Sequence, residues 1–128
     1  MSIEVSTSER VEVRDVTDAV RDAIPEDCER GVCTVYVPHT TAGVAVNEPE
    51  SGLLRDLERA LDALVPANGD YDHDRVDDNA DAHLRAMLLG ESATIPVRDG
   101  DLALGTWQAV LFVECDGPRT RSLSVTVT

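Results

Sequence analysis

Three histidines are the residues of this sequence best suited to metal binding or proton transfer: His39, His73 and His83. His39 follows a proline at the end of a predicted strand, His73 lies in a polar loop, and His83 lies on a predicted helix. Histidines in such places can form a metal or phosphate site. No two of them have HxH or HxxxH spacing, which would fix two ligands locally. Spacing alone therefore favours three unrelated surface or capping histidines.

Asn47 and Glu48 end an apolar predicted strand just before Pro49. They fit a helix N-cap, with a negative charge at the positive end of the helix dipole, and this is the interpretation that the sequence favours. They also fit a carboxylate–amide pair that points into a cleft. The loop from 77 to 81 is densely acidic. A solvated surface is its usual explanation, although hard cations such as Mg²⁺ bind the same oxygens.

The C-terminal third carries polar residues that a sheet does not need. Trp107 is predicted to lie on a strand face with apolar neighbours, which indicates a core residue or an oligomer contact. Gln108 and Glu114 would lie on the opposite face, where they need partners if that face is covered. Arg119 follows a Gly-Pro turn and presents a fork of donors that suits a phosphate or a carboxylate. A salt bridge to one of the many acids explains Arg119 equally well.

The charge balance limits the classes of partner. The 128 residues carry a net charge of −14, and all 11 positive side chains are arginine. A lysine-free acidic surface suits a protein kept soluble in concentrated salt, so we predict a halophilic cytoplasm. Such acidity argues against binding to duplex nucleic acid. No apolar run approaches a membrane span, no signal peptide is visible, and the three cysteines are expected to be reduced thiols.

Hydrophobic periodicity predicts one α+β domain over residues 1–128. Leucines at helical spacing predict a helix that has Pro49 in its first turn and ends at Val65, before Pro66. A second helix is predicted from 80 to 89, ended by Gly90. A shorter helix is predicted from 16 to 23. The strand-rich C-terminal third favours a two-sheet β-sandwich or a barrel-like sheet. Alternating or β-branched runs predict about seven strands, at 3–7, 32–37, 42–46, 93–97, 102–104, 106–115 and 121–128.

Several short motifs, taken together, resemble those of the YjbQ-like proteins, to which secondary thiamine-phosphate synthase activity is attributed. They run in the family's order from about residue 32 to the C-terminus. Cys115 stands where the family often has an apolar or aromatic residue, and the loop around His73 varies. The matching motifs are Pro38-His39-Thr40-Thr41-Ala42, Asn47-Glu48, Asn79 with Asp81-Ala82-His83, Gly105-Thr106-Trp107-Gln108 and Asp116-Gly117-Pro118-Arg119 with Arg121.

This resemblance implies an α+β fold with a β-sandwich, assembled as a homotrimer around a threefold axis, with sites near the subunit boundaries. It also implies a transferase activity that joins hydroxymethylpyrimidine diphosphate to a thiazole phosphate. The products would be thiamine phosphate and pyrophosphate. Whether the site residues meet within one subunit or across an interface is left open by the motifs.

The resemblance also assigns expected roles. Charge that develops on the departing pyrophosphate would be stabilised by arginines and a divalent cation. That cation, Zn²⁺ or Mg²⁺, is expected on His39, His73 and His83, and no organic cofactor is expected. The catalytic residues are expected to be His39, Asn47, Glu48, His83 and Gln108. The substrate is expected to contact Thr40, Thr41, Asn79, Gly105, Thr106, Arg119 and Arg121.

Two other functions compete with this enzyme. The first is a trimeric metal- or anion-binding module without turnover of its own. The second is an interaction protein whose trimer surface matters, with the HTTA and GTWQ motifs as structural corners. The variety of polar side chains in the matched segments favours the enzyme. Its expected partners are a small phosphorylated substrate and two further copies of the chain, with no nucleic acid and no membrane.

Overall fold

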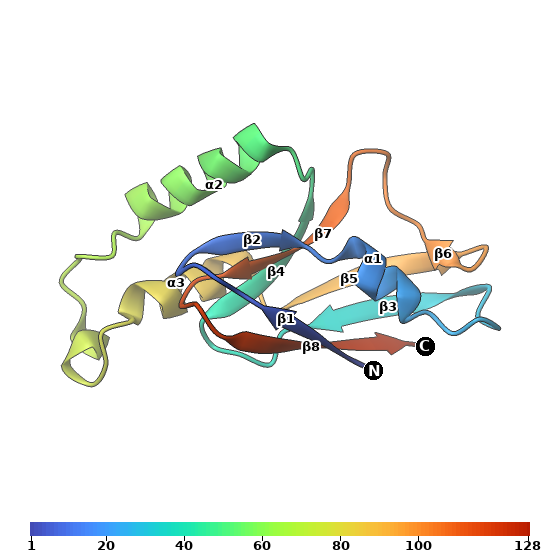
Figure 1. The fold of residues 1–128 in the computed structure, drawn as a ribbon, viewed down its shortest axis with the longest axis horizontal. Coiled ribbons are helices and arrows are strands. Elements are labelled where there is room, and N and C mark those ends of the chain that lie inside the picture. The colour runs from blue at the N-terminus through green and yellow to red at the C-terminus, as the bar shows by residue number, and fades with distance from the viewer.

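A computed structural model describes every residue from Met1 to Thr128. The chain forms two antiparallel sheets, three α-helices and one turn of 3₁₀ helix (Figure 1). The elements, in chain order, are β1 Ser2–Ser6, β2 Glu12–Asp15, α1 Thr17–Asp22, β3 Arg30–Tyr36, β4 Ala42–Asn47, α2 Ser51–Leu64, η1 Asp72–Arg75, α3 Ala80–Leu89, β5 Ser92–Arg98, β6 Asp101–Leu102, β7 Ala109–Glu114 and β8 Thr120–Val127.

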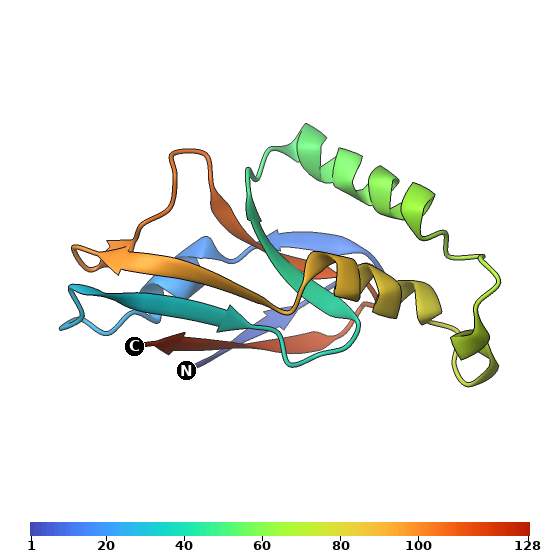
Figure 2. The same cartoon turned by 180° about the vertical axis from the view of Figure 1, so that it is seen from behind.

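The two sheets face each other across the main core. The larger sheet has the strand order β1-β8-β3-β5-β6, and the smaller has the order β2-β7-β4. The two main helices, α2 and α3, lie on the side of the smaller sheet that faces away from the larger one (Figures 1 and 2). The predicted α+β class, with two sheets and two main helices, is therefore confirmed.

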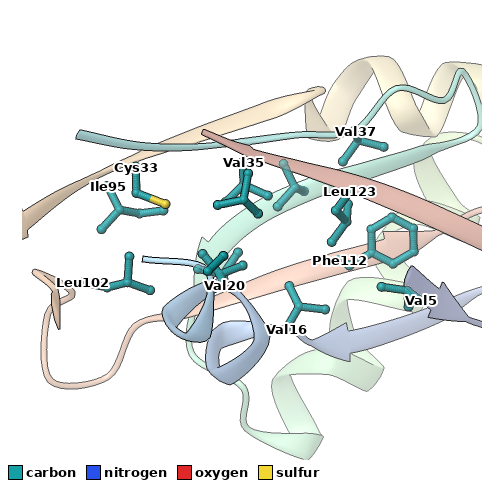
Figure 3. Packing of buried hydrophobic residues seen from close by; sticks show 14 of the residues in the cluster. Val5, Val16, Val20, Cys33, Val35, Val37, Ile95, Leu102, Phe112 and Leu123 are labelled. Carbon is teal, nitrogen blue, oxygen red and sulfur yellow. The ribbon is translucent and has the colours of Figure 1, made fainter. Parts of the chain in front are cut away.

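Strand β7 is buried along its whole length because both of its faces are covered. Val110 and Phe112 point into the core between the sheets, where Phe112 lies near Val5 and Leu123 (Figure 3). Val113 packs on the other side, towards the helices. The sequence of a strand covered on both faces is a continuous apolar run and does not alternate between apolar and polar residues.

The segment before β7 corrects two predictions. Residues 106 to 108 were predicted as strand, but Gly105 to Gln108 form a turn. The Gln108 side-chain Oε1 accepts a hydrogen bond from the Gly105 N–H at 2.8 Å, and the Gln108 N–H donates to the Gly105 carbonyl at 3.1 Å. This local bonding competes with strand pairing. Trp107 lies at the tip of the turn with 73% of its surface exposed, which excludes a core position and leaves the oligomer contact as the remaining interpretation.

Strand β4 follows β3 in the chain but does not pair with it. It leaves the larger sheet and pairs with β7, with Ala42 opposite Glu114 and Asn47 opposite Ala109. The loop from 37 to 41 is thus the crossing between the two sheets. This crossing brings the HTTA motif to one end of both sheets.

Helix α2 is capped by a residue other than the one expected. The Glu50 carboxylate accepts hydrogen bonds from the Gly52 and Leu53 backbone N–H groups. These bonds lower the pKa of Glu50. Asn47 and Glu48 are therefore not the N-cap, and the Asn47 side chain accepts instead from the Glu48 N–H at 2.8 Å. Leu61 is the buried residue of α2, and none of the helices has the length and apolar character that a membrane crossing requires.

Candidate functional site: a cleft at the crossing between the sheets

A cleft of about 730 Å³ opens where the crossing loop, the start of α3 and the turn before β8 meet. All three segments lie at the same end of the sheets (Figure 2). The cleft also contains the carboxylates of Asp77, Glu91 and Asp116, so its charge is mixed. Seven predicted site residues line it: His39, Thr40, Thr41, Asn79, His83, Arg119 and Arg121.

His39 continues the larger sheet after β3 ends. The pairing of β3 with β8 ends with Tyr36 opposite Ser124. Two residues further along, Pro38 would be the partner of Ser122, but proline has no N–H to donate. The His39 ring takes that place, with Nε2 3.1 Å from the Ser122 nitrogen and 3.0 Å from the Ser122 oxygen. The ring is anchored through Nε2 whichever tautomer forms, and Nδ1 is the nitrogen left for a ligand.

Asn79, directly before α3, links two walls of the cleft. Its Nδ2 donates to Asp116 Oδ2 at 3.0 Å, which leaves Oδ1 facing His73 Nε2 at 3.2 Å. An amide oxygen only accepts, so this contact assigns the His73 proton to Nε2. The rings of His73 and His83 pack edge to face with their centroids 4.7 Å apart. His73 thus supports His83 from outside the cleft.

The residues present do not fit the expected three-histidine metal site. No group of three His, Cys, Asp or Glu side chains in the chain is arranged to hold a metal ion. His73 Nε2 is bonded to Asn79, and His39 Nε2 is bonded to Ser122.

Arg119 presents its guanidinium at the mouth of the cleft. Its Nε donates to the Asp116 carbonyl at 2.9 Å and its Nη2 donates to Asp116 Oδ2 at 3.2 Å. The side chain is 49% exposed. Its two hydrogen bonds to Asp116 use Nε and Nη2 and leave Nη1 free. Arg119 is thus held in place on one edge while its other edge can meet an anion.

Arg121 lies deeper and is almost fully bonded within the protein. Its guanidinium pairs with the Glu114 carboxylate, and its Nη2 donates to Thr41 Oγ1 at 2.8 Å. The side chains of Glu114 and Arg121 are 0% and 3% exposed. Burial raises the pKa of Glu114, but the hydrogen bonds from Arg121, from the Asp116 N–H and from Thr7 outweigh it, so the pKa lies below its usual value. The main role of Arg121 visible in this chain is structural.

The remaining predicted site residues lie at the opposite end of the molecule. Glu48, Thr106 and Gln108 line a second hollow of about 500 Å³ around Trp107, and Asn47 lines a smaller one beside it. Gly105 closes the adjoining turn. Because β4 and β7 run antiparallel, Asn47 and Gln108 are separated from the cleft by the strand length, about 17 Å at about 3.4 Å per residue. One chain does not bring the two groups together.

The comparison with known proteins decides the family. The model of the family described as "UPF0047 protein YjbQ-like" matches residues 1–128. This chain belongs to the YjbQ-like family. A UPF0047 protein of Archaeoglobus fulgidus is 50% identical over 125 residues, which cover 98% of each chain. The UPF0047 protein YugU of Bacillus subtilis is 35% identical over 123 residues, covering 94% of this chain and 92% of its own.

Two solved structures share this fold. The hypothetical protein APE1520 from Aeropyrum pernix superposes with a TM-score of 0.96 at 44% identity, covering 100% of this chain and 96% of its own. A YjbQ/UPF0047 family protein from Clostridium acetobutylicum superposes with a TM-score of 0.95 at 38% identity, covering 100% and 99%.

Asp116 in the cleft and Thr7 behind its wall had no role assigned from the sequence. Asp116 was part of a motif, but only the structure shows that it bonds both Asn79 and Arg119. Thr7 lies outside the segment that carries the motifs. It lies behind the Arg119 backbone because β1 pairs with β8, with Ser6 opposite Thr120, and no local pattern signals this.

Proposed function

We propose that the cleft binds a small phosphorylated substrate and that the protein is a cytoplasmic transferase similar to secondary thiamine-phosphate synthases. In this reaction the thiazole nitrogen attacks the methylene carbon of hydroxymethylpyrimidine diphosphate. The new C–N bond forms, the C–O bond to the diphosphate breaks, and pyrophosphate leaves with the electron pair. The observation that carries the proposal is the Arg119 guanidinium, half-exposed at the mouth of a 730 Å³ cleft beside His39 and His83.

Position and charge support this role for Arg119. The chain has a net charge of −14, so an anionic substrate needs a local positive charge to be held at all. A guanidinium fork matches phosphate oxygens in two parallel hydrogen bonds. A donor already fixed by Asp116 loses little freedom as negative charge develops on the leaving group. His39 Nδ1 and the His83 ring are the groups placed to hold a proton for that leaving group.

Product formation by the purified protein tests the proposal. We expect wild-type protein to form thiamine phosphate from the two substrates, and His83→Ala to slow this by about 100-fold or more, as loss of a proton-transfer group does. A chromatographic assay of thiamine phosphate measures both rates. Equal rates for wild type and His83→Ala would remove His83 from the site.

A His73→Ala variant separates the enzyme from the metal-binding alternative. If His73 only packs behind His83, this variant keeps most of the wild-type rate. If the three histidines form a metal site, it loses as much as His83→Ala, and bound metal falls with it. A wild-type protein that binds pyrophosphate but forms no product would favour the anion-binding module without turnover.

We also propose that the protein is a homotrimer. Support comes from large apolar side chains that lie exposed on the turn before β7 and on the helices: Leu64, Met87, Leu88 and Trp107. Exposed apolar groups of this size commonly mark protein–protein contacts. We expect sedimentation in concentrated salt, the condition that the halophilic prediction requires, to give a species three times the 13.8 kDa chain mass. We expect Trp107→Glu to shift it towards monomer, whereas a clean wild-type monomer would contradict the trimer.

A further inference from the structure

A buried hydroxyl stands behind the wall of the cleft that carries Arg119. Thr7 follows β1 and is 8% exposed. Its Oγ1 lies 2.9 Å from Glu114 Oε1, 3.0 Å from the Arg119 nitrogen and 3.0 Å from the Arg119 oxygen. One hydroxyl therefore touches both the buried carboxylate and the backbone of the residue proposed to bind the substrate.

The number of protons settles how these contacts are used. The hydroxyl accepts the Arg119 N–H, because a backbone nitrogen can only donate. The Arg119 oxygen already accepts from the Thr7 N–H at 2.9 Å. The single hydroxyl proton thus has its stronger acceptor in the Glu114 carboxylate, since a charged acceptor makes the stronger bond. Thr7 connects the Arg119 backbone to the buried Glu114–Arg121 pair.

The turn before β8 is pressed directly against this hydroxyl. A Cβ placed on Gly117 would come within 2.8 Å of Thr7 Oγ1 and within 2.3 Å of the Glu9 carbonyl oxygen. Both the N–H and the C=O of Arg119 are bonded to Thr7, and the Arg119 side chain is held by Asp116. The direction in which the Arg119 guanidinium leaves the backbone therefore depends on Thr7.

We propose that Thr7 is a positioning residue for Arg119 and thereby sets the affinity of the cleft for diphosphate-type anions. Thr7 does not itself reach the anion; it acts through the Arg119 backbone and through Glu114. This inference rests on the proposed function of the cleft, because it presupposes that Arg119 binds the anion.

Calorimetric titration of the full chain with inorganic pyrophosphate tests this role. Thr7→Val keeps the shape of the side chain but removes the hydroxyl. We expect it to weaken pyrophosphate binding about tenfold, because a displaced Arg119 guanidinium would lose about one charge-assisted hydrogen bond to the anion. Thr7→Ser restores the hydroxyl and is expected to bind like wild type. Ser6→Ala, which removes an exposed hydroxyl from the preceding residue, is the matched control and is expected to change nothing.

A second comparison isolates the action through Arg119. In an Arg119→Ala background, Thr7→Val is expected to cause no further loss, because the residue that it positions is gone. An equal loss in both backgrounds would overturn the inference, as would wild-type affinity in Thr7→Val. If wild type itself binds no pyrophosphate, the proposed function of the cleft fails. If wild type binds pyrophosphate and Thr7→Val binds it equally well, only the role of Thr7 fails. If Thr7→Val does not fold, Thr7→Ala in the same titrations takes its place.

Discussion

Arg121→Leu is expected to destabilise the fold by about 3–5 kcal/mol, the usual cost of leaving one member of a buried ion pair without its partner. Glu114 is fully buried and accepts most of its hydrogen bonds from Arg121. The variant also removes the bond that holds Thr41 at the cleft. Urea denaturation at neutral pH measures the change, and Arg98→Leu, an exposed arginine at the end of β5, is the matched control.

The pH dependence of the same variant gives a sharper result. In wild type the pKa of Glu114 is lower in the folded state than in the unfolded state. The contribution of Glu114 to stability is therefore fully present above its unfolded-state pKa and is lost as pH falls through its folded-state pKa. In Arg121→Leu burial remains while the main opposing bonds are gone, so the pKa is raised instead. The variant should then gain stability as pH falls from 7 to about 4.5, near the ordinary pKa of glutamate. A cost below about 1 kcal/mol, or a loss of stability on acidification like that of wild type, would contradict the role given to this pair.

Arg119→Ala is expected to lower thiamine-phosphate formation about 100-fold, the scale of losing one preorganised donor to a developing anion. Stability should change by less than about 1 kcal/mol, because the ion pair of Arg119 with Asp116 is half-exposed. The rate assay and a thermal melt, with Arg98→Ala as control, separate these effects.

Arg119→Lys keeps the charge but not the planar fork, so we expect an intermediate rate. A rate for Arg119→Ala within about threefold of wild type would exclude Arg119 from the chemistry proposed here. Equal loss in Arg119→Ala and Arg98→Ala would instead indicate a general effect of charge on a protein of net charge −14.

Much of the fold follows from local patterns in the sequence. Helix α3 spans the predicted residues, because apolar spacing and Gly90 define it, and α2 differs from prediction by two residues at its start and one at its end. The predicted start of β7 is wrong for a local reason. The Gln108 side chain bonds back to Gly105 and closes a turn that the apolar run after it conceals.

The site was predictable only in part, because its geometry depends on how strands pair far along the chain. The HTTA motif and Arg119 meet since β3 ends and β8 begins at one end of the larger sheet. Asn47 and Gln108 belong to motifs that adjoin the same strands as the cleft, yet they lie at the other end of β4 and β7, and only the pairing register shows this. Thr7 is brought to Glu114 and to the Arg119 backbone by pairing across more than a hundred residues, which no local pattern encodes.

The most direct test of the cleft as an anion site is a crystal structure of the protein with pyrophosphate. We expect pyrophosphate to lie between Arg119, His39 and His83, with the Arg119 guanidinium and the His39 Nδ1 within hydrogen-bond distance of its oxygens. Pyrophosphate bound only in the hollow around Trp107, with the cleft between the sheets empty, would contradict it.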